Sequence, residues 1–178
     1  MAPAGAATRP TSDRVRQAVF DMLWHSPWAG RPAVEGAVVL DAFAGTGALG
    51  LEALSRGAAR ATFLETDGAA LRALRANIAA CREEEHCTVL PADAARPPRA
   101  AAACTLVFLD PPYSEGLVES SLRALSAAGW VAPNALVCAE TPAGPDGAAA
   151  SPPGFALLAE RAHGPARVLF LRPEGSGA

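Results

Sequence analysis

Lysine is absent from this sequence of 178 residues, and all 15 of its basic residues are arginine. The net charge of −3 excludes the class of strongly basic proteins that bind nucleic acid without sequence specificity. No apolar run approaches the roughly 20 residues of a membrane span, and residues 1–7 lack the pattern of a secretory signal. We therefore expect a cytoplasmic protein with no membrane association, and we expect residues 1–7 to be disordered.

Cysteine and histidine are scarce and scattered. The four cysteines form no C-x-x-C pair, and the three histidines do not cluster with them. We expect no metal site, and we expect reduced thiols that are buried as small apolar groups. The cysteines are Cys81, Cys87, Cys104 and Cys138.

Short apolar runs alternate with helical patterns, which is typical of a parallel sheet covered by helices on both faces. The length suits one domain over residues 1–178. Helices are expected at 12–24, 48–56, 67–81 (with the apolar stripe Leu71, Leu74, Ile78 and Cys81) and 119–127. Strands are expected at 37–41, 60–65, 87–91, 104–110 and 135–140, followed by a loop over 141–154 and an antiparallel hairpin of 155–161 with 167–172.

A glycine motif follows the first expected strand. Residues 45–50 match G-x-G-x-x-G, and Glu65 lies 20 positions after Gly45 at the end of the next strand. Glycines there allow a tight turn and close approach of a ligand to the backbone, while the carboxylate can accept hydrogen bonds from ribose hydroxyls. The motif predicts a nucleoside cofactor without saying which one.

Asp41 bears on the identity of that cofactor. It ends the first strand beside the glycine loop, where a dinucleotide would place its phosphates, and a carboxylate would repel them. S-adenosylmethionine has no phosphate and carries a sulfonium and an ammonium group, so Asp41 favours it. The alternative is that Asp41 only caps a helix or orders the loop.

Two further aspartates follow strand ends. Asp93 comes just after the third strand and Asp110 ends the fourth. Because the carboxyl ends of parallel strands share one crevice, Asp41, Glu65, Asp93 and Asp110 are expected to line one cleft. Asp93 can accept a hydrogen bond from an adenine amino group, or it can cap the next segment instead.

The most specific motif is Asp110-Pro111-Pro112-Tyr113. An exocyclic amino group of a nucleobase is a poor nucleophile, because its lone pair is delocalised into the ring. The Asp110 carboxylate and the Pro111 carbonyl can each accept one amino hydrogen, and the prolines restrict the backbone so that the carbonyl stays in place. Tyr113 offers a face on which an unstacked base can lie. The motif therefore predicts methyl transfer by positioning and electrostatics, without a metal.

The sequence resembles the RsmD-type family of bacterial 16S rRNA guanine 2-amino methyltransferases. The resemblance extends from Thr8 to Arg172 and rests on the stretch TRPTSDRVR at 8–16, on LDAFAGTGALGLEALSRGA at 40–58, on FLDPPY at 108–113 and on Gly129-Trp130. The DPPY element within FLDPPY is shared with adenine 6-amino methyltransferases, so it indicates the reaction type. The first two stretches indicate this family.

The resemblance implies a Rossmann-like α/β sheet of seven strands, mostly parallel with the last strand antiparallel, and S-adenosylmethionine as the cofactor. It implies the small ribosomal subunit, with its 16S rRNA, as the substrate. We expect no obligate protein partner and a monomer. The predicted cofactor-binding residues are Asp41, Ala42, Phe43, Gly45, Thr46, Gly47, Glu65, Asp93 and Ala94, and the predicted catalytic residues are Asp110, Pro111, Pro112 and Tyr113.

Arg9, Arg14 and Arg16 are predicted to contact RNA, although a solvated helix start explains them equally well. Members of the family usually carry a basic β-hairpin before the Thr-Arg-Pro-Thr stretch, and here seven neutral residues stand in its place. Three alternatives stay open: an adenine 6-amino methyltransferase of DNA or RNA, a ribosome-assembly factor that binds the cofactor and methylates incidentally, and a nicotinamide-dependent oxidoreductase. The last leaves residues 110–113 unexplained.

Overall fold

The computed structural model describes residues 13–112, 116–142 and 151–175. The predictions for residues 1–7, Arg9 and Tyr113, and for the middle of the 141–154 loop, lie outside these ranges. The helices are α1 (Asp13–His25), α2 (Ala48–Ser55), α3 (Gly68–Cys81) and α4 (Leu117–Ala127), with short 3-10 turns at Arg31–Ala33 and Glu84–His86. The strands are β1 (Val38–Ala42), β2 (Arg60–Glu65), β3 (Cys87–Pro91), β4 (Cys104–Leu109), β5 (Val131–Pro142), β6 (Phe155–His163) and β7 (Ala166–Pro173).

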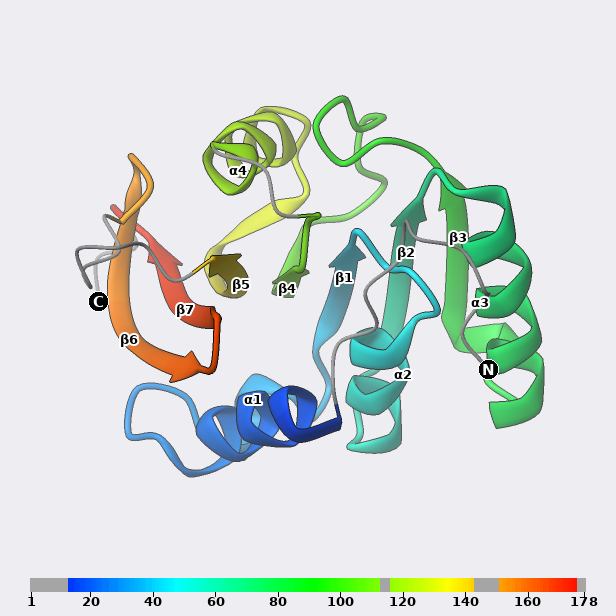
Figure 1. The fold of residues 1–178 in the computed structure, drawn as a ribbon, viewed down its shortest axis with the longest axis horizontal. Coiled ribbons are helices and arrows are strands. Elements are labelled where there is room, and N and C mark those ends of the chain that lie inside the picture. The colour runs from blue at the N-terminus through cyan, green and yellow to red at the C-terminus, as the bar shows by residue number, and fades with distance from the viewer. Residues whose placement is uncertain (1–12, 113–115, 143–150, 176–178) are drawn as a thin grey trace.

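One sheet of seven strands runs through the molecule in the order β3-β2-β1-β4-β5-β7-β6 (Figure 1). Strands β1 to β5 are parallel, and β7 is antiparallel to both of its neighbours. The predicted α/β sheet with an antiparallel last strand is thus confirmed. Chain order reverses between β1 and β4, and parallel α/β sheets bind ligands beside such a switch point.

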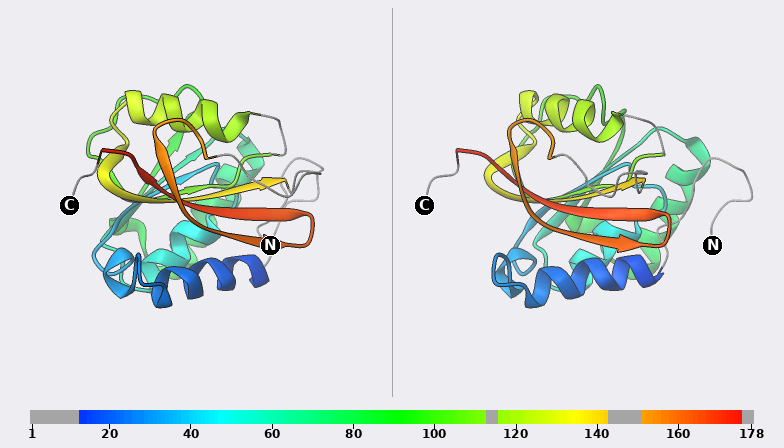
Figure 2. Two further views of the ribbon diagram at one scale, coloured as in Figure 1. Left: turned by 90° about the vertical axis from the view of Figure 1, so that its left-hand side faces the viewer. Right: turned by 60° about the vertical axis from the view of Figure 1, so that its left-hand side comes forward.

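Helices cover both faces of the sheet, as the apolar strands predicted. Helices α1, α2 and α3 pack on one face of the sheet (Figures 1 and 2). There the ring of Phe20 of α1 packs at a tilt against the ring of Phe108 of β4, with ring centroids 5.6 Å apart. Helix α4 covers the other face through the buried residues Leu122 and Leu125. Among the described residues we find no helix with the length and hydropathy of a membrane span.

Some boundaries and burial predictions differ from the structure. Strand β5 begins at Val131 rather than at 135, because Val131 pairs with Cys104 across an irregularity in the register. Helix α4 begins at Leu117, two residues before the prediction. The prediction of four buried thiols was wrong for Cys81, which is exposed because α3 ends there, and Cys87 is only half-buried. Cys104 and Cys138 are buried.

Candidate active site

The register of the sheet brings the predicted carboxylates to one edge. Asp41 of β1 lies level with Phe63 of β2 and Phe108 of β4. Glu65 and Asp110 each come two residues later, so they flank the end of β1 from the two neighbouring strands. Strand β3 continues this edge beyond β2, because Glu65 lies level with Pro91, two residues before Asp93.

The glycine loop between β1 and α2 has an unusual backbone. Phe43, Gly45 and Gly47 have φ values of 92°, 56° and 84°, and Phe43 is a non-glycine residue in this range. L side chains rarely adopt such values, and they persist where the surroundings over-determine them. The amides of Phe43 and Ala44 both donate to the Leu64 carbonyl of β2, at 3.2 and 2.9 Å, and so anchor the start of the loop.

Asp41 lies beneath this loop rather than on its surface. Its side chain is buried, with the residue 2 % exposed, and Oδ2 accepts a hydrogen bond of 2.9 Å from the Gly50 amide in the first turn of α2. Burial raises the pKa of Asp41 to about 8; the Gly50 hydrogen bond opposes this shift, and the Asp110 and Glu65 carboxylates reinforce it. The loop-ordering role that the sequence left open is therefore present in the structure, and direct contact with a cofactor stays a prediction.

Glu65 ties the glycine loop to the start of α3. Its Oε2 accepts a hydrogen bond of 2.7 Å from the Gly45 amide, and its Oε1 accepts bonds of 2.9 Å from the Thr66 and Asp67 amides. Each carboxylate oxygen has two lone pairs, so Oε2 retains the capacity to accept a ribose hydroxyl. Glu65 thus fixes the backbone at Gly45 and at the start of α3, and its predicted ribose contact is compatible with those hydrogen bonds.

Asn77 is a site residue that the sequence reasoning missed. Its Nδ2 donates a hydrogen bond of 3.0 Å to the Thr46 carbonyl in the glycine loop. Asn77 lies on α3, 31 positions after Thr46, and no spacing rule links it to the motif. Its only sequence signal is a polar side chain next to Ile78 on the apolar face of an amphipathic helix.

The three motif glycines face different surroundings. A methyl group on Gly47 would lie 2.3 Å from Leu74 Cδ1, and one on Gly50 would lie 2.4 Å from the Phe63 ring. A methyl group on Gly45 would meet no atom within 4 Å. Gly47 therefore allows the loop, and Gly50 the first turn of α2, to pack closely on neighbouring side chains, whereas Gly45 leaves its side of the loop open to a ligand.

These features fit a cationic nucleoside ligand without phosphate. The Gly45 amide binds Glu65, the side of Gly45 that would carry a side chain is open, and Asp41 and Asp110 lie close enough to interact electrostatically with each other. The Glu65 carboxylate attracts a cation and repels phosphate, and Asp41 does the same once it has lost its proton. The residues present thus suit S-adenosylmethionine better than a dinucleotide.

Asp93 forms a turn after β3. Its Oδ1 accepts a hydrogen bond of 2.9 Å from the Ala95 amide, and Oδ2 lies 3.8 Å from Arg96 Nε. Its side chain is 42 % exposed, and the next residue, Ala94, is buried. Asp93 is therefore a turn-forming acid with an accessible carboxylate, and its adenine contact stays a prediction.

The Asp110-Pro111-Pro112 segment follows β4 directly, beside the end of β1. Asp110 is half-buried, Pro111 is buried and Pro112 is exposed. The buried Pro111 restrains the backbone on the protein side, and the half-buried Asp110 stays accessible from the sheet edge. The structure thus brings the catalytic candidates Asp110 and Pro111 next to the glycine loop.

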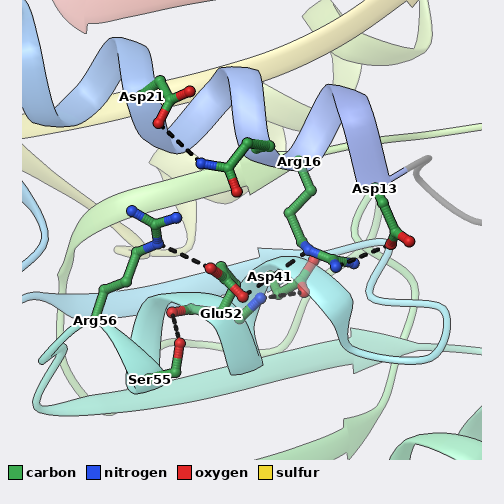
Figure 3. Close-up of polar contacts among 9 residues, drawn as sticks. Asp13, Arg16, Asp21, Asp41, Glu52, Ser55 and Arg56 are labelled. Carbon is green, nitrogen blue, oxygen red and sulfur yellow. Dashed lines mark hydrogen bonds and ion pairs between the residues drawn. The ribbon is translucent and has the colours of Figure 1, made fainter.

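The two predicted RNA-contacting arginines within the described residues differ in their surroundings. Arg14 is exposed on the first turn of α1. Arg16 instead pairs with Asp13 of α1 at 2.9 Å and with Glu52 of α2 at 4.0 Å, and its side chain is 28 % exposed (Figure 3). The structure therefore brings Arg16 to the α1–α2 interface and leaves Arg14 in solvent.

The sequence and the fold match known proteins. The family model "Conserved hypothetical protein 95" matches residues 1–172. The chain is 34 % identical over 175 residues to "Ribosomal RNA small subunit methyltransferase D" of Escherichia coli K12, covering 98 % of this chain and 84 % of that protein. The protein of the same name from Haemophilus influenzae is 35 % identical over 160 residues, covering 88 % and 78 %.

Solved structures share the fold. "Putative methyltransferase yhhF" from Escherichia coli superposes with a TM-score of 0.80 at 34 % identity, covering 97 % of this chain and 91 % of that one. An RNA methyltransferase from Salinibacter ruber, solved in complex with S-adenosyl-L-homocysteine, gives a TM-score of 0.68 at 17 % identity, covering 93 % and 95 %. At 17 % identity, the similarity to the Salinibacter ruber protein concerns the fold alone.

Proposed function

The chain belongs to the family described as Conserved hypothetical protein 95, and from that premise we propose that it transfers a methyl group from S-adenosylmethionine to the exocyclic 2-amino group of a guanine in small-subunit ribosomal RNA. The names of the curated relatives support an rRNA methyltransferase. The choice of guanine and of its 2-amino group rests on the resemblance of residues 8–16 and 40–58 to the RsmD-type family.

The observation that carries this proposal is the position of Asp110-Pro111 beside the glycine loop, at the carboxyl ends of adjacent strands β4 and β1. When bound, S-adenosylmethionine supplies an electrophilic methyl group on a positively charged sulfur. The Glu65 carboxylate stabilises a positive charge at this edge, and Asp41 adds to that stabilisation once it has lost its proton. Before the cofactor binds, Glu65 holds the loop at the Gly45 amide, and the buried Asp41 holds the first turn of α2 at the Gly50 amide.

Asp110 and Pro111 act on the target amino group. The Asp110 carboxylate and the Pro111 carbonyl each accept one amino hydrogen, which favours a pyramidal nitrogen and directs its lone pair toward the methyl carbon. Asp110 is also placed to take the proton that the nitrogen loses after it forms its new bond. Tyr113 is proposed to stack on the base.

We propose that the substrate is the small ribosomal subunit, assembled or assembling, and that the enzyme acts in the cytoplasm as a monomer. A protein of net charge −3 needs a local basic contact to bind RNA, and the exposed Arg14 is a candidate together with Arg9. The alternative target, an adenine 6-amino group, would use the same Asp110-Pro111 chemistry.

Transfer of labelled methyl from S-adenosylmethionine tests the proposal. Purified protein is incubated separately with unmodified small subunits, free rRNA and DNA, and the label is identified by nucleoside analysis. We expect label in 2-amino-methylguanosine from the subunits. Label in adenine would overturn the base assignment, and the absence of both transfer and cofactor binding would overturn the proposal.

A further inference from the structure

We propose that Asn77 is a positioning residue for the cofactor, acting through the Thr46–Gly47 peptide of the glycine loop. The inference rests on the proposed function, because it concerns the same loop. It extends that function by assigning to α3 a role in setting the conformation in which the loop receives the cofactor.

The Thr46–Gly47 peptide is held from both sides. Its carbonyl accepts the 3.0 Å hydrogen bond from Asn77 Nδ2, and its amide donates a 2.8 Å hydrogen bond to the Ala44 carbonyl. The two groups point in opposite directions across the peptide plane. These contacts therefore fix the orientation of the plane about the chain.

This peptide is otherwise free to rotate. Gly47 has a φ of 84°, and glycine populates positive and negative φ about equally. A rotation of the plane would exchange the directions of its carbonyl and its amide without moving the ends of the loop. It would then change the polar groups that the loop presents beside the open side of Gly45.

Helix α3 makes two contacts with the loop from one face. Leu74, which is fully buried, packs so closely on Gly47 that a methyl group there would lie 2.3 Å from its Cδ1. Asn77 is three residues further along, so its side chain lies on the same face of the helix. Leu74 sets the distance between helix and loop, and Asn77 sets the orientation of the peptide.

The other loop contacts do not duplicate this one. Glu65 binds the Gly45 amide, and Asp41 binds the Gly50 amide. Both are carboxylates and accept hydrogen bonds from the backbone. Among the described residues, Asn77 is the side chain that donates to a carbonyl of the 43–47 loop.

The test compares Asn77→Ala with the wild type and with Arg75→Ala. Alanine removes the donor and raises the intrinsic helix propensity at this position, so α3 itself is not weakened. Arg75 is exposed on the same helix, which makes Arg75→Ala a matched control. Binding of S-adenosylmethionine and S-adenosylhomocysteine is measured by calorimetry, and amide hydrogen exchange is measured on the cofactor-free protein.

We expect Asn77→Ala to weaken binding of both ligands about three- to tenfold, which corresponds to the loss of one net hydrogen bond. We expect faster exchange of the Gly47 amide in the cofactor-free variant. In rate measurements, KM for S-adenosylmethionine should rise while KM for the RNA substrate and kcat at saturation stay near wild type. Arg75→Ala should change none of these quantities.

A folded Asn77→Ala protein with wild-type affinity and wild-type Gly47 exchange would overturn the inference. So would a loss of affinity accompanied by an equal change in Arg75→Ala. If Asn77→Ala fails to fold, Asn77→Asp keeps the side-chain size and places an acceptor against the Thr46 carbonyl, so Gly47 exchange should again rise. If the wild type binds neither ligand, the proposed function fails, whereas Gly47 exchange still decides the role of Asn77.

Discussion

Arg16 of α1 places its Nε 4.0 Å from Glu52 Oε2 of α2, and the same carboxylate accepts a 2.8 Å bond from Arg56 Nε through its other oxygen (Figure 3). The side chains of Arg16, Glu52 and Arg56 are 28, 29 and 23 % exposed. The guanidinium carbon of Arg56 also lies over the Phe20 ring, 5.0 Å from its centroid. The helix that carries the N-terminal signature is thereby joined to the helix that begins in the glycine loop.

This relationship separates two arginines that share the sequence signature. Arg16→Ala should lower the free energy of unfolding by about 0.5–1 kcal/mol, because the pairs it loses are partly exposed. Arg14→Ala should leave the free energy of unfolding unchanged and weaken binding to small subunits. The slope of log affinity against log salt concentration should become smaller in magnitude by about 1. Denaturant unfolding and RNA binding at several salt concentrations measure the two effects. Weaker RNA binding by Arg16→Ala alone would contradict this division.

Asp41 should make both stability and cofactor binding depend on pH. Its pKa is raised to about 8 in the folded protein, against about 4 in the unfolded chain. Between these values the folded state binds more protons than the unfolded state, so the free energy of unfolding falls as pH rises from about 4 to 8. Asp41→Asn keeps an acceptor for the Gly50 amide and removes this titration. Its unfolding midpoint should therefore fall less than that of the wild type over this range.

Loss of the Asp41 proton, which lowers the stability of the fold, should by contrast raise the affinity for a cationic ligand. Affinity for S-adenosylmethionine should increase as Asp41 loses its proton near pH 8, because the carboxylate then attracts the sulfonium charge. Subtracting the pH profile of Asp41→Asn removes the contribution of the ligand's own amino group. Parallel profiles of wild type and variant would contradict a role for the Asp41 charge.

Gly45 and Gly47 form a matched pair of loop positions. Gly47→Ala should destabilise the fold by about 3 kcal/mol, because it adds left-handed strain to a clash with Leu74. Gly45→Ala carries the strain without the clash and should cost only about 1 kcal/mol. It should nevertheless weaken cofactor binding, because its methyl group occupies the open side of the loop. Thermal unfolding and calorimetry measure these effects, and equal stability losses would refute the packing argument.

Asp110→Ala should abolish methyl transfer to small subunits while cofactor affinity stays within about threefold of wild type. The reason is that Asp110 is proposed to bind the amino group of the base, whereas the loop contacts come from Asp41 and Glu65. Single-turnover transfer and calorimetry distinguish the two steps. Loss of cofactor binding in this variant would instead make Asp110 a cofactor residue.

Most of the architecture could be predicted from local patterns. Apolar runs alternating with helical stripes indicated β1 to β5 and α1 to α4, and the hairpin of β6 and β7 followed from two runs around His163-Gly164-Pro165. Errors lay at element ends, such as the early start of β5 and the exposed Cys81. There the outcome depends on pairing and packing with distant residues, which periodicity does not contain.

The sequence by itself determined the class of fold, the order of its strands along the chain and the position of the glycine and Asp-Pro-Pro motifs at strand ends, because these depend on local periodicity and on spacing within short segments. Only the tertiary structure decided which groups touch. It buried Asp41 against Gly50, directed Arg16 to Glu52 and brought Asn77 to Thr46 across 31 residues. Those contacts depend on how helices α1, α2 and α3 dock on one face of the sheet, and docking is set by the summed packing of the core rather than by any single stretch of chain.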